Sequence, residues 1–351
     1  MKIRVVASDL PHPQGSAAGR DLWAWCEAAR ALGHDLKAWI WFVSPVSPEG
    51  PVPEWAEYRP ASRTTRWGTF VSAAQAKAAG FEPDPDAVVV ADHLPSGGAL
   101  VGKRRSVLTL HYRALLDAKS VRQLRPWHLR TAYEEIHLSR RSGAVLAFSE
   151  RVGRGVGRRT HVVPMTAPLP EAPFPVVEEP VAALLADWWW KPNRAALDTL
   201  LRAWPEVRRR VPGARLVLGG RKFPEAAVGA MAGVEAIGPV EDSSEVLSRA
   251  AILAFPCPSS SGPKGKTLEA LAHGMAVVTT PGGMEGIRLL PGGEAMVVSE
   301  SGFAARLAEL LADPRRRAEL GSIGRASVVA NHAPEVAAKA RLNVFERTFG
   351  R

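Results

Sequence analysis

A chain of 351 residues is too long for one ordinary core and predicts two domains of usual size. Apolar residues make up 46% and charged residues 23% of the sequence, which excludes a disordered or fibrous protein. The apolar runs are only strand-length, and no basic segment followed by a long apolar one begins the chain, so we expect neither a membrane span nor a secretory signal. Cys26 and Cys257 are expected to be free thiols in a reducing, cytoplasmic compartment.

The net charge of +10 is concentrated in one stretch of the chain. Between residues 98 and 165 there are 14 Lys and Arg against four Asp and Glu. Such a stretch attracts a phosphorylated molecule, a membrane surface or nucleic acid. Aromatic residues that could stack on bases are sparse there, so nucleic acid is not the expected partner. A solvated basic face without a partner is the alternative.

The first half alternates short β-rich runs with helical stretches. Strands are expected at 2–7, 35–43, 87–91, 106–110 and 144–149, and a helix at 21–32. A loop rich in Pro and Gly, residues 11–20, follows the first strand. Asp84-Pro85-Asp86 has the D-x-D spacing that holds a metal in some enzymes, but it precedes a strand and is predicted to be a turn. We therefore expect an α/β domain with a mainly parallel sheet and no metal site.

Six prolines between residues 164 and 180 predict a linker, after which the alternation begins again. Strands are expected at 181–186, 214–218, 234–237, 252–254 and 277–279, with helices at 194–211, 243–250, 267–273, 302–312, 314–331 and from 334. The predicted domains are 1–165 and 181–333, joined by the linker 166–180, with a C-terminal helix at 334–351 that packs back on the first domain. Two doubly wound, Rossmann-like α/β domains facing each other across a cleft are the expected fold, with ligands at the carboxyl ends of the strands.

The segment from residue 255 to residue 287 has the richest chemistry. A loop of small residues leads from a strand into a helix that begins near Gly265, so its amides and the helix N-terminus form an anion site suited to a diphosphate. Lys264 and Lys266 add positive charge, and Glu269 lies where a carboxylate can accept hydrogen bonds from ribose hydroxyls. The spacing of a P-loop is absent.

Residues 261–287 resemble the C-terminal signature of retaining glycosyltransferases of family 4, in the subgroup that reads E-G-x-x-N-K-x-L-E-A-M-A-x-G-x-P-V-V-x-T-x-x-G-x-E-G-I. The resemblance implies the GT-B fold and a nucleoside diphosphate sugar as donor. Glu269 matches the second glutamate, which binds the ribose in that family, and Lys266 matches its lysine. Ser261 stands where the family has its first glutamate, which contacts the donor sugar, and this departure leaves the donor sugar and the catalytic rate open.

Other blocks fit the same family in order. Residues 187–193, D-W-W-W-K-P-N, resemble its donor loop and place Lys191 at the donor diphosphate, although the tryptophans could instead pack around a turn. Gly219 matches a strand-end glycine, and Val240 lies in a loop resembling the one whose backbone meets the base.

In the first domain, residues 11–20 occupy the family's Gly-rich first loop, and Gly15 is the expected point of close approach to the ligand. Thr109-Leu110-His111 matches the family's T-x-H, where the imidazole meets the sugar. His93 fits the end of the preceding strand. The alternative is that both histidines are structural.

The prediction is a transferase that moves a sugar from a nucleoside diphosphate sugar to an unidentified acceptor, with retention and without a cofactor or metal. The predicted catalytic residues are His111, Lys191 and Lys266. The residues predicted to bind the donor nucleotide are Glu269, Gly265, Thr267, Leu268, Gly219 and Val240. Those predicted to contact the donor sugar or the acceptor are Gly15, His93, Ser261 and Gly262.

The basic stretch favours an anionic or lipid-linked acceptor and a peripheral position on the inner face of a membrane. Two other functions stay open on the same fold: a sugar-nucleotide epimerase or hydrolase, and a non-catalytic protein that binds an anionic partner.

Overall fold

The computed structural model describes residues 1–13, 15–42, 52–60, 80–224, 226, 228–229, 231–240, 242–258 and 261–350. The chain divides into two compact units. The first consists of Met1–Ala118, Leu124–Pro168 and His332–Arg351, and the second of Lys119–Gln123 and Leu169–Asn331. The predicted linker, 166–180, spans the change from the first unit to the second, and the C-terminal residues belong to the first unit.

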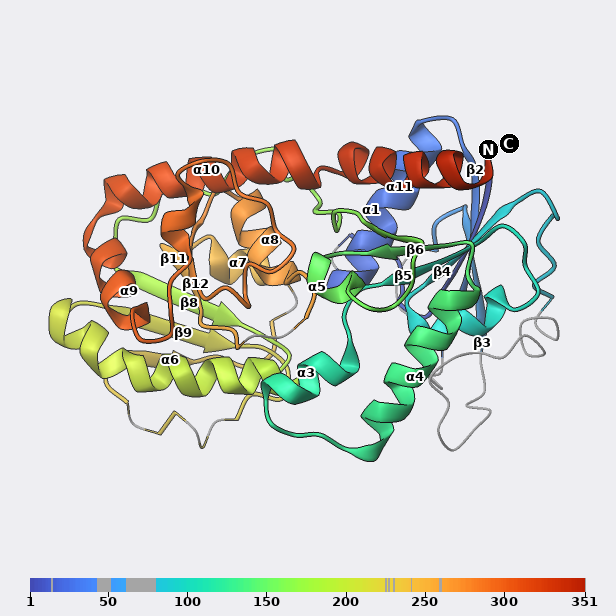
Figure 1. Ribbon diagram of the computed structural model, residues 1–351. Helices are drawn as coiled ribbons and strands as arrows, with labels where there is room; N and C mark the ends of the chain where they lie inside the picture. Colours follow the sequence, from blue (N-terminus) through green and yellow to red (C-terminus); the bar gives the residue numbers. More distant parts are fainter. Residues whose placement is uncertain are drawn as a thin grey trace. The chain divides into compact units, whose positions relative to one another are not determined.

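The first unit is built on a parallel sheet of seven strands in the order β3-β2-β1-β4-β5-β6-β7 (Figure 1). The strands are β1 (Lys2–Ala7), β2 (Asp35–Phe42), β3 (Ala56–Pro60), β4 (Val88–Asp92), β5 (Ser106–Leu110), β6 (Ala144–Ala147) and β7 (Thr160–Val162). The helices are α1 (Ala17–Ala31), α3 (Ala114–Ser120, which crosses the unit boundary), α4 (Pro126–Arg141), α5 (Glu150–Gly153), α11 (Pro334–Phe349) and a 3-10 helix at Leu94–Leu100. Strands β4, β5 and β6 are buried along their whole length, as their continuous apolar sequences require.

The second unit has a parallel five-stranded sheet in the order β10-β9-β8-β11-β12. Its strands are β8 (Val181–Leu185), β9 (Arg215–Gly219), β10 (Val234–Ala236), β11 (Ile252–Phe255) and β12 (Ala276–Thr279). Its helices are α6 (Lys191–Arg210), α7 (Ser243–Leu247), α8 (Gly265–Ala272), α9 (Phe303–Ala312), α10 (Pro314–His332, whose last residue belongs to the first unit) and a 3-10 helix at Gly293–Met296.

Each sheet has one place where the strand order changes direction. In the first unit it lies between β1 and β4, and in the second between β8 and β11. Loops that leave the carboxyl ends of two such strands turn to opposite faces of the sheet and leave a crevice where ligands bind. Ligand-binding residues are therefore expected directly after β1, β4, β8 and β11.

The predicted elements are observed, with shifts of a few residues at their ends, whereas the strands β3 and β7 and the helices α3, α4 and α5 were not predicted. Helix α1 begins four residues earlier than expected, because Ser16 caps it by accepting a hydrogen bond from the Gly19 amide at 3.0 Å. Helix α8 begins at Gly265, as predicted. Strand β2 ends at Phe42, and the last residue of the strand expected there, Val43, lies outside the described residues.

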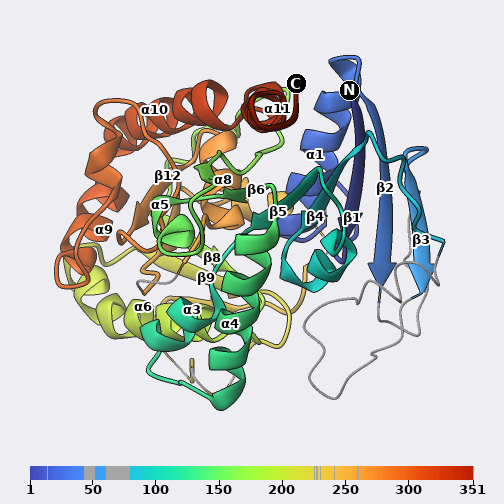
Figure 2. The ribbon, with the colours of Figure 1, turned by 45° about the vertical axis from the view of Figure 1, so that its right-hand side comes forward.

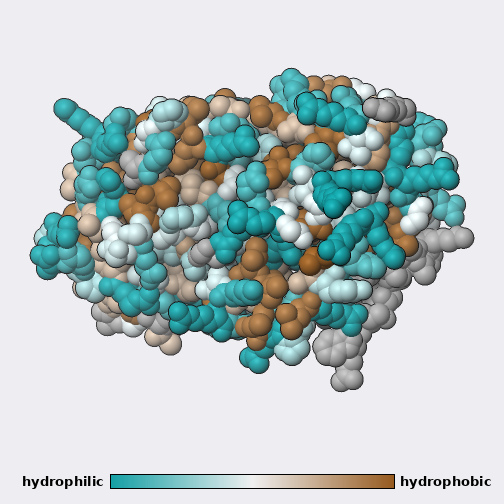
Figure 3. Space-filling model, in the orientation of Figure 1, coloured by the Kyte–Doolittle hydropathy of each residue, from teal (hydrophilic) through white to brown (hydrophobic). Residues whose placement is uncertain are grey.

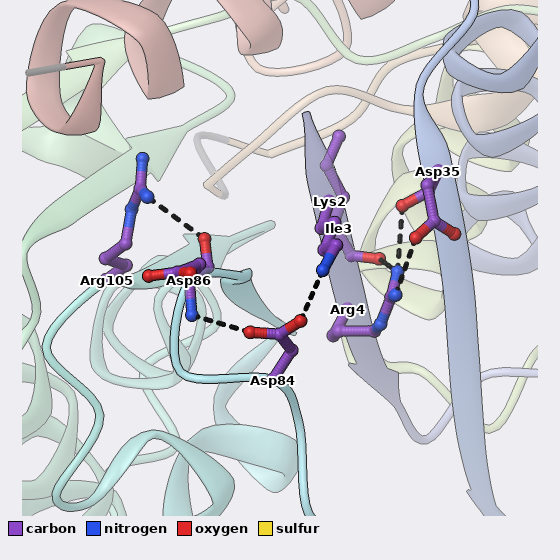
Figure 4. A network of polar contacts seen from close by, with 7 residues as sticks. All are labelled: Lys2, Ile3, Arg4, Asp35, Asp84, Asp86 and Arg105. Carbon is purple, nitrogen blue, oxygen red and sulfur yellow. Dashed lines mark hydrogen bonds and ion pairs between the residues drawn. The ribbon is translucent and has the colours of Figure 1, made fainter.

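The D-x-D sequence forms a turn, as predicted (Figure 4). The Asp86 amide donates to Asp84 Oδ1 at 3.0 Å, and Lys2 pairs with the other carboxylate oxygen of Asp84. The Asp86 carbonyl accepts from Arg105. The turn precedes β4 and thus lies at the end of the strand opposite to the crevice.

The C-terminal helix α11 lies alongside α1 in the first unit (Figures 1 and 2). The buried side chains on these helices include Trp25 and Cys26 of α1 and Phe345 of α11. Cys26 and Cys257 are both buried free thiols, as predicted.

Candidate functional site

The start of helix α8 is a concentrated positive site in the second unit. The amides of Thr267 and Leu268 both donate to the Lys264 carbonyl, at 2.9 and 3.1 Å. Among the described residues the amides of Gly265 and Lys266 have no such partner, so they stay available at the helix N-terminus. A helix N-terminus of this kind attracts an anion.

Two lysines place their charges beside this N-terminus. Lys264 is buried, and its ammonium donates to the carbonyls of Ser261 and Gly262, which fixes the loop before the helix. Lys266 donates to Asn193 Oδ1 at 2.7 Å, and its ammonium lies 4.3 Å from the centre of the Phe255 ring. Burial, together with the charge of Lys264, lowers the pKa of Lys266 to about 8, against the opposing effects of Cys257, Glu269 and Asp187.

The start of α6 lies at the same place as the start of α8. Asn193, in the first turn of α6, is 4% exposed and connects the two helices through Lys266. The Trp190 ring, just before α6, lies 5.9 Å from the Lys264 ammonium. Lys191 is the first residue of α6, and its side chain is exposed and donates to Gln123. Two helix N-termini and three lysines are thus gathered where β8 and β11 end.

The three tryptophans of the expected donor loop have different environments. Trp188 is fully buried and donates to the Gly219 carbonyl at 2.9 Å, so it is a packing residue. Trp189 is 70% exposed, and Trp190 faces Lys264. The packing alternative therefore holds for Trp188 alone.

Glu269 lies one turn into α8 and is half-buried. Its carboxylate accepts a hydrogen bond from the hydroxyl of Ser243, the first residue of α7. Ser243 orients the carboxylate that is predicted to bind the ribose, and the sequence had not pointed to it.

A second carboxylate lies beside the position of the missing family glutamate. Ser261 is 2% exposed, and the next residue, Gly262, has a φ of 75° and donates its amide to Glu285 Oε1 at 3.1 Å. Glu285 belongs to the loop after β12 and is half-buried. Its carboxylate thus reaches the residue next to Ser261 from a different loop.

The other predicted nucleotide residues fall into two groups. Gly219 is buried at the end of β9, where an added Cβ would lie 2.4 Å from Ile237, and Val240 is half-buried in the loop after β10. Thr267 and Leu268 are buried, and both amides are used by Lys264. The structure therefore does not bring the side chains of Thr267 and Leu268 to the positive site at its surface.

In the first unit, acidic and imidazole groups meet at the ends of β4 and β5. His111 Nε2 lies 2.9 Å from Asp92 Oδ1, and both residues are buried. The His93 ring lies 5.1 Å from the His111 ring. His93 has a φ of 71°, and its Nδ1 is buried without a hydrogen-bond partner among the described residues. A strained backbone and an unsatisfied buried nitrogen are typical of a ligand-binding position.

The pKa values of the two imidazoles are shifted in opposite directions. Burial lowers the pKa of His93 to about 3, and the charge of His111 reinforces this, so His93 is neutral. Burial also lowers the pKa of His111, but the carboxylates of Asp92, Asp21 and Asp9 outweigh it and leave that pKa above its ordinary value. Burial raises the pKa of Asp92, but His111 and other cations outweigh it and leave that pKa below its ordinary value.

Of the two glycines that follow β1, Gly15 in the loop and Gly19 in the first turn of α1, Gly19 is packed more tightly against neighbouring backbone. An added Cβ at Gly19 would lie 2.2 Å from the Leu10 carbonyl oxygen, whereas one at Gly15 would lie 3.2 Å from the nearest atom, in His12. Packing therefore requires the glycine at 19, and close approach of Gly15 to a ligand stays a prediction. Gln14 of this loop lies outside the described residues.

Three ligand-type groups, of Asp21, Asp92 and His111, lie within 4.8 Å of one another in the first unit. Arg341 Nη2 lies 2.7 and 3.0 Å from the two oxygens of Asp21, and Asp21 Oδ1 also accepts from the Thr166 amide at 2.6 Å. The protein's own guanidinium thus already supplies the positive charge that a metal would bring to Asp21.

The sequence of the second unit matches a known enzyme family. Residues 179–313 match the model described as Glycosyl transferases group 1. The match lies entirely within the second unit. The positive site and Glu269 lie within it, and the expectation of a transferase is confirmed. No curated protein matches the sequence at a significant level.

Solved glycosyltransferase structures share the fold of this protein. Sucrose-phosphate synthase from Thermosynechococcus elongatus has 17% identity and a TM-score of 0.77, with 100% of both chains covered. HepE from Anabaena, solved with UDP-glucose, has 16% identity and a TM-score of 0.69, with 100% of both chains covered. The chain covers 56% of TarM from S. aureus, with 75% of its own length, 12% identity and a TM-score of 0.63. At these identities the likeness shows the fold alone, and two Rossmann-like domains of the GT-B class are confirmed.

The sequence did not point to several residues around the positive site of the second unit and around the Asp21, Asp92 and His111 groups of the first unit. Asn193 and Glu285 were visible only as letters of two motifs, without a role assigned to either, and Ser243 had no signal. Asp21 and Arg341 are 320 positions apart and could be paired only by the fold.

Proposed function

We propose that the protein transfers a sugar from a nucleoside diphosphate sugar to an acceptor, with retention at the anomeric carbon and without a cofactor or metal. The observation that carries the proposal is the Lys266 ammonium held by Asn193 between the N-termini of α6 and α8. Retention is what the family 4 resemblance of residues 261–287 implies. The anomeric proton coupling of the product, read by NMR, tests it.

The chemistry proposed for this site is stabilisation of a leaving group. The acceptor hydroxyl oxygen forms a bond to the anomeric carbon while the bond from that carbon to the diphosphate oxygen breaks, and the hydroxyl proton passes to the departing diphosphate. The negative charge that develops on the diphosphate is met by Lys191, Lys266 and the free amides of α8. No covalent intermediate with a side chain is needed.

In the first unit, His111 and His93 are proposed to bind the sugar or the acceptor in different ways. His111 bonds Asp92 through Nε2 and has no further hydrogen bond to the described residues, so its Nδ1 can bond a polar group of the substrate, as a donor when the ring is protonated and as an acceptor when it is neutral. His93, which is neutral, offers the unpartnered Nδ1. HepE was solved with UDP-glucose and TarM with UDP and a GlcNAc-glycerol, which is consistent with sugar ligands on this fold.

Glu269→Ala is expected to weaken nucleotide binding by about 1–3 kcal/mol, the value of a lost hydrogen bond to a charged group. Isothermal titration calorimetry with the nucleoside diphosphate measures it. Glu245→Ala, which removes a carboxylate from α7 without touching Glu269, is the matched control and should bind as the wild type does. Equal affinity in the folded Glu269→Ala variant would remove the ribose role of this residue.

Chelation by EDTA is expected to leave turnover unchanged, because lysines and helix N-termini provide the positive charge at the diphosphate. The initial rate is measured before and after dialysis against EDTA, with magnesium and manganese added back separately. Loss of the rate with EDTA and its return with either ion would mean that a metal takes part in the reaction.

The exposed face of α4 supports a further part of the proposal, contact with an anionic membrane. Trp127, Leu129 and Tyr133 are 49%, 57% and 66% exposed. Arg130, Arg140 and Arg141 share that face, whereas both carboxylates of the helix, Glu134 and Glu135, are buried. Aromatic and aliphatic anchors interleaved with arginines fit the interfacial region of an anionic bilayer.

The charged surface differs from the one expected from the sequence. Arg122 and Arg125 of the basic stretch precede α4, which begins at Pro126. Arg113 is buried against Glu135 and does not reach the surface. In the part of the chain that the structure describes, no helix has both the length and the apolar character to cross a bilayer. The face shown in Figure 3 is mostly hydrophilic, with apolar groups gathered between polar ones.

Sedimentation with vesicles that contain anionic lipid tests the membrane contact. The protein is expected to bind at low salt and to release as salt rises, because each basic residue near the surface contributes about 1 kcal/mol that is screened. Arg140→Glu with Arg141→Glu should abolish binding, whereas Arg209→Glu with Arg210→Glu, an adjacent exposed pair on α6, should not. Binding that is absent at every salt concentration, or equally lost in both double variants, would contradict the contact.

A further inference from the structure

The C-terminal helix α11 places the side chain of Arg341 beside the buried group formed by Asp21, Asp92 and His111 in the first unit. Arg341 of α11 is 2% exposed, and its guanidinium lies 5.0 Å from the Trp25 ring centre and 5.2 Å from the Phe148 ring centre. Its Nη2 contacts both oxygens of Asp21, which is fully buried on α1. A surface helix that delivers an arginine to this depth does more than cover the sheet.

Two routes lead from Arg341 to His111. The Asp21 carboxylate lies within 4.8 Å of the ligand-type atoms of Asp92 and His111. The Phe148 ring, which faces the guanidinium on one side, lies 4.8 Å from the His111 ring. The first route is electrostatic, through the Asp21 carboxylate, and the second is a packing contact through the Phe148 ring. Both end at the His111 imidazole.

We propose that Arg341 is a positioning residue of the sugar-transfer site, which holds Asp21 and Phe148 so that Asp92 and His111 form a buried carboxylate–imidazole pair with His111 Nδ1 turned to the substrate. The proposal rests on the proposed function for its catalytic consequence, but the charge state of His111 is a property of the free protein. Without Arg341, the carboxylates of Asp21 and Asp92 would lie close together with only one imidazolium between them, an arrangement that burial disfavours.

Groups from four parts of the unit set the charge of His111. Asp92 at the end of β4, Asp21 on α1 and Asp9 after β1 act on His111 directly, and His93 interacts with it as well. Arg341 on α11 and Cys26 on α1 interact with Asp92. The carboxylates of Asp92, Asp21 and Asp9 favour the imidazolium, whereas burial disfavours it. Removing Asp21 therefore lowers the pKa of His111, so His111 loses its proton at lower pH.

The test is an NMR titration of the His111 ring in the free protein, with His111→Gln to assign the signal. Because Arg341→Met alone leaves Asp21 buried without a cation, the informative variant is the neutral pair Asp21→Asn with Arg341→Met, in which the introduced amide oxygen can still accept from the Thr166 amide. Its His111 midpoint is expected below that of the wild type, because Asp21 acts on His111 directly whereas Arg341 acts on its partner Asp92. Arg341→Lys, which keeps the charge, should retain the midpoint.

Leu342→Ala is the matched control, because Leu342 is buried on the same helix and has no polar group. It loosens the packing of α11 and should leave the His111 midpoint in place. In the neutral pair, the alkaline limb of kcat/KM is expected to move to lower pH together with the midpoint, while nucleotide affinity stays unchanged.

A midpoint that does not move in the folded neutral pair, or that moves equally in Leu342→Ala, would overturn the inference. A midpoint that moves while the kcat/KM profile stays fixed would overturn the positioning role in sugar transfer. Absence of activity with every donor in the wild type would instead contradict the proposed function, and the NMR titration would still decide the network.

Discussion

Lys266→Met is expected to lower kcat by about 10²- to 10³-fold, or about 2.7–4 kcal/mol, the cost of losing one preorganised group that stabilises charge in the transition state. The methionine keeps the contact with the Phe255 ring and removes the ammonium held by Asn193. Steady-state kinetics with the donor sugar measures the change. An unaltered kcat in a folded variant would mean that the leaving diphosphate is stabilised elsewhere.

The same lysine gives donor binding a pH dependence with a definite sign. Its pKa of about 8 in the free protein means that it is charged below pH 8 and loses its proton above it. A bound diphosphate favours the charged form and raises the pKa of Lys266 in the complex. Above pH 8 binding therefore requires uptake of a proton, and the dissociation constant should rise by up to about tenfold per pH unit.

Lys266→Arg is the control for this pH dependence, because its guanidinium stays charged throughout the range. The step above pH 8 should be absent in Lys266→Arg and in Lys266→Met. A step that persists in both variants would belong to another group, and Lys266 would not be the cation that meets the diphosphate.

Arg341→Met is expected to lower the free energy of unfolding by about 3–5 kcal/mol, because it leaves the Asp21 carboxylate buried without its cation. Replacing both partners, with Asp21→Asn and Arg341→Met, should recover most of that loss, since a neutral pair carries no uncompensated charge. Urea denaturation followed by tryptophan fluorescence compares the two variants with the wild type.

Arg347→Met, near the exposed end of the same helix, is the matched control and should change the free energy of unfolding by less than about 0.5 kcal/mol. If the neutral pair is no more stable than Arg341→Met alone, the loss comes from packing around the arginine rather than from the unpaired carboxylate. The further inference would then lose its charge-based route to His111.

Much of the fold could be predicted because each strand is a short, continuous apolar run. Strand β5 was expected at its observed residues, and β4 was displaced by one. The short outer strands β3 and β7 were missed, because neither has a continuous buried run: β3 mixes charged with apolar residues, and all three residues of β7 are only half-buried. Local hydrophobic pattern predicts central strands better than edge strands.

The site could be predicted only where its residues are close together in sequence. Lys266 and Glu269 lie three positions apart on α8, so a motif contained both. Asn193 reaches Lys266 from 73 positions away and Ser243 reaches Glu269 from 26 positions away. No local pattern records such pairs, because they are formed when strands separated in sequence are brought side by side in a parallel sheet.

The central claim is that the second unit binds a nucleoside diphosphate sugar at the start of α8. Thermal unfolding with a panel of such donors tests this claim most directly. A donor present at about 100 times its dissociation constant adds about 2.7 kcal/mol to the stability of the folded state. We predict that at least one member of the panel raises the Tm of the wild type and that Glu269→Ala and Lys266→Met lose most of this rise. A panel that leaves the wild-type Tm unchanged, or that stabilises all three proteins equally, would contradict the assignment of this site.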